Sequence, residues 1–213
     1  MKYPCVYVYK RTSDKGQELK YSIRSLENVK NWNGEVFVAG DNEDWFKDVK
    51  VIEAKKSHVK WTDQENKLRA IVGDKRVADD FIYFNDDMYC VTPTEITPLY
   101  DGKLENYTGK NGWQKAKSDT KDYLEKKGAT IFNYDIHVPM VFNKDKLAKI
   151  LDILDENRKQ PRSLYGNLYE IGGEQYKDRK TYTSKLRKGK LLSTKRFTPE
   201  LKELFKSKSR YEL

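Results

Sequence analysis

The stretch "DDFIYFNDDMYCVTP", residues 79–93, joins a hydrophobic run to a group of polar side chains. Residues 81–84 are apolar throughout, which is typical of a strand that helices cover on both faces of a sheet. Asn85, Asp86 and Asp87 follow at once, before apolar residues resume. The stretch therefore predicts a buried strand that ends in a fixed, acidic turn.

Strand and helix patterns alternate before this stretch. Strands are expected at residues 5–11, 35–41 and 50–55, and helices at 18–32 and from Thr62, which forms a capping-box pattern with Glu65. Apolar residues at helical spacing predict a further helix at 144–159, and 163–176 suits a helix and turn. This alternation predicts an α/β protein of Rossmann type, with a mixed, mostly parallel sheet flanked by helices. In such sheets ligands bind at the carboxyl ends of the strands.

Composition predicts one folded domain. The chain has 213 residues, 37% of them hydrophobic, and its 15 Tyr, 8 Phe and 4 Trp argue against disorder. No segment resembles a signal peptide or reaches the ~20 apolar residues of a membrane span, so a cytosolic location is expected. Cys5 and Cys90 lie in strand-like runs without zinc-site spacing, which predicts buried free thiols.

The net charge of +9 is concentrated at one end of the chain. Residues 177–213 carry 13 Lys or Arg against 4 Asp or Glu, whereas the first 176 residues carry 29 of each sign. A basic segment can serve a nucleic acid, an anionic membrane surface or a phosphorylated substrate, and it can also be a solvated tail. Charge alone does not choose among these.

The paired acids at 86 and 87 suggest metal chemistry. Two adjacent, partly shielded carboxylates repel each other, and Mg²⁺ or Mn²⁺ relieves that repulsion and bridges to phosphate. A loop cap at a strand end is the alternative for such a pair. His137 lies in "NYDIHVPM", where it is a candidate metal ligand or a structural histidine. Asp135 precedes it by two residues, which in an extended segment puts both side chains on one face.

Several stretches together resemble the GT-A glycosyltransferases, and most of all the Stealth-type sugar-phosphate transferases. They are "ELKYSIRSLENVKNWNGEVFVAGD" (18–41), "NKLRAI" (66–71), the acidic stretch itself, "DIHVPMVFNK" (135–144) and the closing "LFKSKSRYEL" (204–213). Small phage or bacterial glycosyltransferases are similar. Because the strand at 5–11 lacks an acid that the Stealth group carries, sugar transfer from a nucleotide diphosphate is favoured over sugar-phosphate transfer.

The resemblance implies a set of site residues. Asn85, Asp87 and His137 would hold Mn²⁺ or Mg²⁺, and Asp86 and Asp135 would act in catalysis, Asp135 as a general base. The implied donor-binding residues are Tyr9, Arg11, Arg24, Asp63, Asn66, Lys67, Lys206, Lys208 and Arg210. The C-terminal ending would fold back over the donor phosphates.

Three functions remain open at this stage. The first is a metal-dependent glycosyltransferase of residues 1–213, with a nucleotide-sugar half at 1–100, an acceptor-side half at 101–176 and the basic segment at 177–213. The second is a basic nucleic-acid-binding module without catalysis, whose available aromatics are Tyr182, Phe197, Phe205 and Tyr211. The third is a metal-dependent phosphoryl transferase or nuclease. The first two combine if the acceptor is a modified base in DNA, which would suit a phage; a cell-surface glycan is another possible acceptor.

Overall fold

The computed structural model describes residues 1–13, 16–107, 112–154, 159–178, 180 and 190–213. The chain divides into two compact units. Unit 1 comprises Met1–Ile96, His137–Phe142 and Arg179–Leu213, and unit 2 comprises Thr97–Ile136 and Asn143–Asp178. The single domain expected from chain length, with divisions after residues 100 and 176, stays a prediction.

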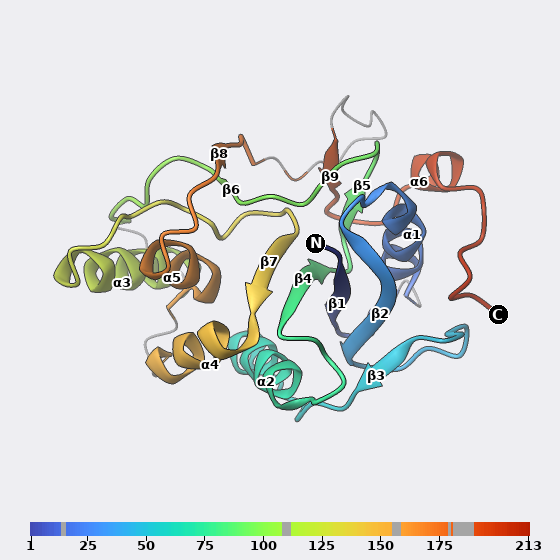
Figure 1. Cartoon of the computed structure of the whole chain (residues 1–213), viewed down its shortest axis with the longest axis horizontal. Coiled ribbons are helices and arrows are strands. Elements are labelled where there is room, and N and C mark those ends of the chain that lie inside the picture. The colour runs from blue at the N-terminus through green and yellow to red at the C-terminus, as the bar shows by residue number, and fades with distance from the viewer. Residues whose placement is uncertain (14–15, 108–111, 155–158, 179, 181–189) are drawn as a thin grey trace. The chain divides into compact units, whose positions relative to one another are not determined.

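Unit 1 is built on a five-stranded sheet with the order β3-β2-β1-β4-β7. The strands are β1 Tyr3–Tyr9, β2 Trp32–Gly40, β3 Lys50–Ile52, β4 Asp80–Asn85 and β7 Met140–Asn143. Strand β1 pairs in parallel with both β2 and β4, and β2 pairs in parallel with β3. The expected α/β class with a mostly parallel sheet is therefore confirmed (Figure 1).

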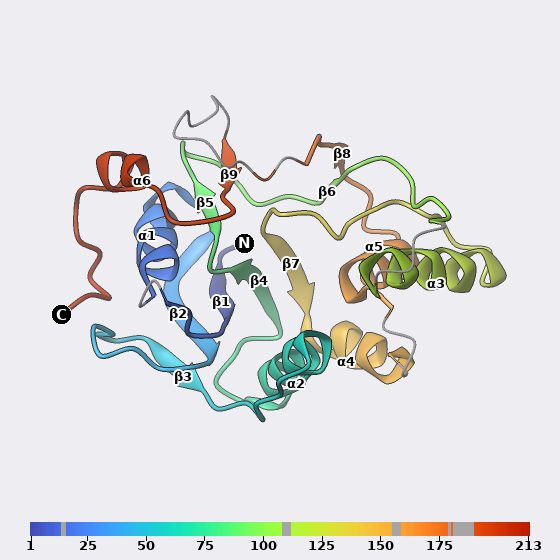
Figure 2. The same ribbon diagram turned by 180° about the vertical axis from the view of Figure 1, so that it is seen from behind.

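Two helices cover opposite faces of this sheet. They are α1 Gln17–Ser25, which the 3-10 helix η1 Leu26–Asn28 extends, and α2 Lys60–Gly73. On the α1 face, Tyr7 Oη lies 3.1 Å from Ser22 Oγ. On the other face, Gln64 Nε2 of α2 donates to Tyr83 Oη at 3.2 Å. Because successive side chains of a strand alternate between faces, the sheet is apolar on both sides, as residues 81–84 predicted. Figures 1 and 2 show the ribbon from opposite sides, with α1 and α2 at separate places around the sheet.

In unit 1 the helix boundaries differ from the sequence prediction in two places. The helix expected at 18–32 ends at Ser25 and continues only as η1, because Val29 is extended and Lys30 N donates to Thr94 O at 2.8 Å. The capping box predicted at Thr62 is wrong: α2 begins two residues earlier, so Thr62 is helical, and no side chain caps the helix. The acid in the first turn is Asp63.

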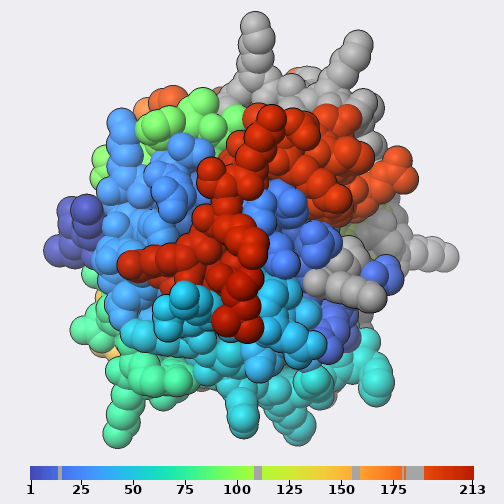
Figure 3. Space-filling model, turned by 90° about the vertical axis from the view of Figure 1, so that its right-hand side faces the viewer, coloured from blue at the N-terminus to red at the C-terminus, as the bar shows by residue number. Residues whose placement is uncertain are grey.

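The C-terminal part of unit 1 is held to the rest of that unit. Strand β5 (Met88–Cys90) pairs antiparallel with β9 (Leu191–Ser193). Helix α6 (Pro199–Leu204) follows, and Tyr89 packs in one apolar cluster with Leu201. Figure 3 shows the C-terminal residues, in red, lying across the blue N-terminal part of the chain.

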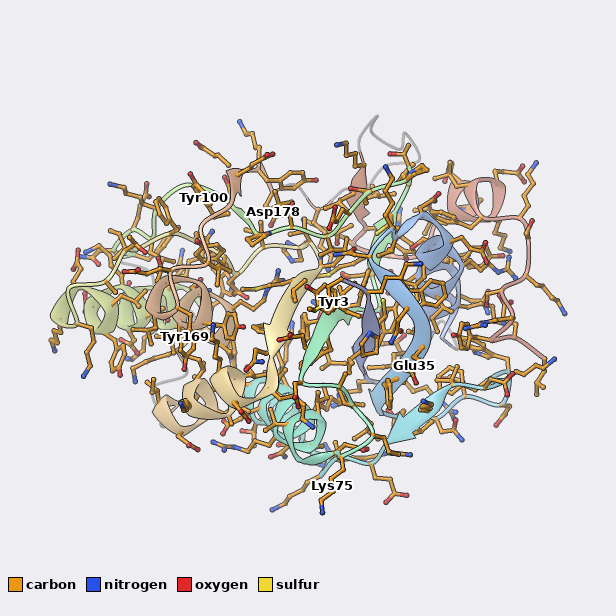
Figure 4. The ribbon with its side chains drawn as sticks, in the orientation of Figure 1. Tyr3, Glu35, Lys75, Tyr100, Tyr169 and Asp178 are labelled. Atoms are coloured by element: carbon orange, nitrogen blue, oxygen red, sulfur yellow. The ribbon has the colours of Figure 1, made fainter. Side chains whose placement is uncertain are left out.

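Unit 2 contains three helices and one short parallel strand pair among its described residues. They are α3 Gly112–Lys126, α4 Lys144–Ile153, α5 Pro161–Leu168, β6 Leu99–Tyr100 and β8 Glu174–Gln175. Helix α5 contacts both α3 and α4. Tyr100, labelled in Figure 4, packs on Phe132 with 4.4 Å between ring centroids. The helix expected at 144–159 ends at Ile153, and residues 155–158 lie outside the described residues.

No helix in the described parts of the chain has the length and apolar character needed to cross a membrane. Cys5 and Cys90 are buried free thiols, as predicted.

Candidate functional site

The parallel strands of unit 1 bring several candidate residues to one edge of the sheet. Tyr9 pairs with Gly40 at the ends of β1 and β2, and Asn85 ends β4 beside Val8. We call this the carboxyl edge, where α/β proteins generally bind their ligands. Tyr9 and Asn85 end their strands, and Arg11, Asp86 and Asp87 follow them. Lys67 lies against Gly40, and it pairs with Asp63. Asn66 bonds to the segment after β3.

Glu43 organises the end of β1. Tyr9 Oη donates to Glu43 Oε1 at 2.6 Å, and Arg11 Nε donates to the same oxygen at 2.9 Å. Arg11 N also donates to Asp41 Oδ2 at 2.8 Å. Tyr9 and Glu43 are buried, whereas the Arg11 side chain is half-exposed. Tyr9 is thus part of a fixed framework, and Arg11 keeps an open face toward solvent.

A buried ion pair lies beside the end of β2. Lys67 Nζ donates to Asp63 Oδ2 at 2.5 Å, and both side chains are only 8% exposed. Burial alone would raise the pKa of Asp63, but Lys67 and the Ser57 N–H hold it below its usual value. Gly40 has φ of 129°, and a Cβ there would lie 2.9 Å from Lys67 Cε. The glycine therefore lets the Lys67 stem lie against the strand end.

Amides line the edge near β4. Tyr83 Oη donates to Asn85 Oδ1 at 2.7 Å, so Asn85 is held along the strand. Asn66 Nδ2 donates to Lys55 O at 2.9 Å, which ties α2 to the segment after β3. Both amides have fixed orientations and remain half-buried.

Asp87 is the least satisfied acid at this edge. Its side chain is 10% exposed, Oδ2 forms an ion pair with Lys180, and Oδ1 is buried without a hydrogen-bond partner among the described residues. A buried carboxylate oxygen without a partner is costly, and it commonly marks a place for a ligand, ion or water. Asp86, beside it, is half-buried.

Further unsatisfied oxygens surround Asp87. Thr194 N donates to Asp87 O at 3.3 Å, and Thr194 Oγ1 and Tyr89 Oη are buried without hydrogen-bond partners among the described residues. Burial raises the pKa of the Tyr89 phenol well above its usual value, although Thr194 lies near enough to oppose this. The region is therefore rich in neutral and anionic oxygen donors, which suit a hard cation.

These residues fit a divalent cation only with help from a ligand. Within the described ranges, no group of three or more His, Cys, Asp or Glu side chains is arranged to hold a metal ion. The protein contributes Asp87 Oδ1, which has no hydrogen-bond partner among the described residues, and Asp86 is adjacent. A diphosphate would supply the missing oxygens, because phosphate is an ordinary partner of Mg²⁺.

His137 and Asp135 belong to different units. His137 is half-buried in unit 1, three residues before β7, and β7 is hydrogen-bonded to β4. Asp135 belongs to unit 2, where Gln160 Nε2 donates to its Oδ2 at 2.7 Å. Residues 136–138 form a bend, so the extended geometry expected for this pair is wrong.

Arg24 makes a bidentate ion pair instead of facing the carboxyl edge. Its Nε and Nη2 donate to the two carboxylate oxygens of Glu212 at 2.8 and 2.7 Å. The guanidinium carbon also lies 4.4 Å from the Tyr21 ring centroid. This geometry is that of a structural ion pair.

Of the closing basic residues, Arg210 lies away from the carboxyl edge. Lys206 Nζ pairs with Glu203 at 2.8 Å, and Lys208 Nζ donates to the Leu213 carbonyl at 3.1 Å. Arg210 donates to the carbonyl of Gly34, near the amino end of β2. Arg210 is therefore at the opposite end of the sheet from Asn85 and Asp87. Tyr182 lies outside the described residues.

Three residues at the carboxyl edge were missed in the sequence. Asp41 ends the strand predicted at 35–41 and Glu43 follows two residues later, much as Asp86 follows β4, and this parallel was the available signal. Lys180 carried no local signal, because its partner lies far away in the sequence.

Comparison with known proteins gives only distant likenesses. No family model matches the chain, and no curated protein matches it. Among solved structures, the glycosyltransferase GlyE of Streptococcus pneumoniae TIGR4 is 9% identical to this chain, with a TM-score of 0.39. The matched region covers 82% of this chain and 45% of the GlyE chain. The 4-diphosphocytidyl-2C-methyl-D-erythritol synthase of Anaerococcus prevotii DSM 20548 is 8% identical with a TM-score of 0.42, covering 84% of this chain and 88% of its own. The chain thus spans less than half of GlyE. At such TM-scores neither likeness decides family or function, and the fold class rests on the sheet itself.

Proposed function

We propose that this chain is a glycosyltransferase that takes a nucleotide diphosphate sugar as its donor and uses Mn²⁺ or Mg²⁺. The observation that carries the proposal is Asp87, a carboxylate buried just beyond the end of β4 with one oxygen open. An acid of this kind at the carboxyl edge suits a cation that bridges to phosphate. The bound cation would stabilise the negative charge of the departing diphosphate.

The surroundings of the carboxyl edge support an anionic donor. Lys10, Arg11 and Lys56 are exposed there, and the ammonium of Lys67 is buried nearby. Glu43, Asp41 and Asp63 pair with Arg11, Lys56 and Lys67, whereas Lys10 Nζ donates to the Ser57 carbonyl at 3.3 Å and has no carboxylate partner among the described residues. A diphosphate that arrives at this edge would therefore meet fixed positive charge.

The proposal assigns roles to the motif residues. Asp87 and Asp86, with the Asn85 amide, would hold the cation, and His137 would join them. Asn66, Lys67 and Asp63 would contact the donor. Asp135 would accept the proton of the acceptor hydroxyl, a role that Gln160 supports by fixing one carboxylate oxygen at 2.7 Å. The acceptor stays open between a DNA base and a glycan.

Incubating the protein with a panel of nucleotide diphosphate sugars, with Mn²⁺ and with chelator, tests this function. Slow Mn²⁺-dependent release of a nucleoside diphosphate from one donor is expected, because water can replace the missing acceptor and hydrolyse the donor slowly. Release of a nucleoside monophosphate would instead indicate sugar-phosphate transfer. Hydrolysis of none of the panel, with nucleotide binding also absent, would overturn the proposal.

A further inference from the structure

A pocket lies in unit 1, away from the carboxyl edge. It has a volume of about 420 Å³ and lies between the end of α1, the start of β2 and the C-terminal residues. We call it the amino-edge pocket. Its lining includes Lys2, Lys30, Trp32, Arg210 and Tyr211. Its volume falls within the roughly 300–1,000 Å³ that is typical of small-ligand sites.

The amino-edge pocket is distinct from the candidate donor site. Trp32 pairs with Tyr3 at the first residues of β2 and β1, whereas Gly40 pairs with Tyr9 at their last residues. Trp32 and Gly40 are eight positions apart along β2, which corresponds to about 26 Å. A ligand in the pocket would therefore not contact the reaction site proposed at Asp87.

Trp32 gives the pocket an aromatic surface of fixed orientation. Its Nε1 donates to Glu35 O at 2.8 Å, which sets the plane of the indole. The ring is half-buried, and its centroid lies 6.0 Å from that of Tyr211, which is buried in the core. An indole held in this way can receive a flat ring without first being ordered.

Three cations surround this aromatic surface. Lys2 and Lys30 are exposed, and their ammonium groups make no ion pair or hydrogen bond with the described residues. The guanidinium carbon of Arg210 lies 6.0 Å from the Trp32 ring centroid. Glu27 is the single acid that lines the pocket, so its net charge is positive.

The wall that carries Arg210 is anchored. Tyr211 is 3% exposed, and Glu212 forms the bidentate ion pair with Arg24. Leu213 N donates to Trp45 O at 3.0 Å. On the other side of Arg210, Ser209 N donates to the Glu212 carboxylate at 2.9 Å. The pocket is therefore preformed by contacts on both sides of Arg210, and binding there needs little ordering of the chain.

We propose that the amino-edge pocket binds a nucleotide of a single-stranded nucleic acid. The base would stack on Trp32, and Lys2, Lys30 and Arg210 would neutralise the adjoining phosphates. Aromatic side chains interleaved with cations are the usual means of binding single strands, because every base offers a flat face. A polymer is favoured over a free nucleotide because a further exposed cation, Lys208, lies two residues from Arg210 and outside the pocket lining. The inference does not depend on the transferase reaction.

Fluorescence anisotropy with labelled oligothymidylate tests the proposal at several salt concentrations. The parent protein should bind, and Trp32→Ala should weaken binding about 5- to 100-fold, the scale of losing one stacked base. Lys2→Gln/Lys30→Gln should weaken binding and lower the slope of log affinity against log salt by about 1.4, or 0.7 for each lost phosphate contact. Since both lysines are exposed, this double variant should fold even if Trp32→Ala does not.

Matched controls use exposed side chains outside the pocket. Lys75→Gln/Lys149→Gln removes the same charge, and Trp113→Ala removes an indole that is 44% exposed; both should bind like the parent. Equal losses in the pocket variants and the controls would overturn the proposal, as would no binding at low salt. Unlabelled thymidine monophosphate should compete much more weakly than the unlabelled oligomer at equal molar concentration. If the two compete equally, the site binds free nucleotides and the assignment to a nucleic acid is wrong.

Discussion

The guanidinium of Arg24 and the carboxylate of Glu212 form a bidentate ion pair between residues 188 positions apart, with N–O distances of 2.8 and 2.7 Å. Their side chains are 10% and 2% exposed. Ser209 N donates to the same carboxylate at 2.9 Å. This pair fastens the end of the chain to α1, so the C-terminal residues are part of the folded unit.

Glu212→Gln should lower the free energy of unfolding by about 3 kcal/mol near neutral pH, because it leaves the Arg24 charge buried without its partner. The check is urea denaturation of the parent and the variant. An exposed control pair is available in Glu65→Gln, which breaks the pair with Arg69 on the surface of α2 and should cost about 0.5 kcal/mol.

The same pair predicts a pH dependence. Burial alone would raise the pKa of Glu212, but Arg24 and the Ser209 N–H hold it below its usual 4.5. A carboxyl group whose pKa is lower in the folded state than in the unfolded state stabilises the fold at pH values above its unfolded-state pKa. That contribution to the free energy of unfolding is lost as pH falls below about 4.5. The stability gap between the parent and Glu212→Gln should therefore shrink from pH 6 toward pH 3, and a constant gap would contradict the assignment.

Lys180→Met should tighten Mn²⁺ binding about 10-fold in the absence of nucleotide. The ammonium of Lys180 holds Asp87 Oδ2 and so competes with a cation for that carboxylate. Titration calorimetry with Mn²⁺ measures this, and Lys190→Met, at an exposed lysine, is the control. Weaker Mn²⁺ binding by Lys180→Met would show that Lys180 supports the site and does not compete for it.

His137→Ala should weaken cation-supported donor binding by about one to two powers of ten, the scale on which metal sites respond to the loss of a supporting group. Nucleoside diphosphate titrations with Mn²⁺ and with chelator separate the cation-dependent part. If donor affinity stays the same while the melting temperature falls, His137 has a structural role.

Lys67→Met/Asp63→Asn should reduce donor affinity about 10- to 100-fold, because it removes the buried ammonium next to Gly40. Changing both residues avoids leaving one buried charge alone, which a single substitution would do. Arg69→Met, two residues along the chain from Lys67 on an exposed face of α2, is the control. Donor affinity equal to that of the parent would remove Lys67 from the site.

Local patterns in the sequence were enough to predict the central sheet. The apolar run at 81–84 and the helical spacing around Leu68 and Ile71 reflect burial on one or both faces of an element, which neighbouring residues encode. The turn after β4 was also identifiable, because polar side chains at the carboxyl end of a strand in an α/β sheet commonly bind ligands.

Long-range pairings could not be predicted from such patterns. Nothing around Arg24 indicates Glu212 as its partner, and nothing around Asp87 indicates Lys180. The pairing of β5 with β9 likewise joins segments about a hundred residues apart. Periodicity indicates which face of an element is buried, but it does not indicate what that face packs against. The sequence therefore led us to expect Arg210 near the donor phosphates, whereas Arg210 lies at the amino end of β2.

Calorimetric titration of a nucleoside diphosphate into the parent and into Asp87→Asn, each with and without Mn²⁺, tests the central claim most directly. Asparagine keeps the size of the side chain and removes its charge, so the fold should survive. The account predicts Mn²⁺-dependent binding to the parent and its loss in Asp87→Asn. Equal Mn²⁺-dependent binding by both proteins, or binding that is indifferent to Mn²⁺ in the parent, would contradict it.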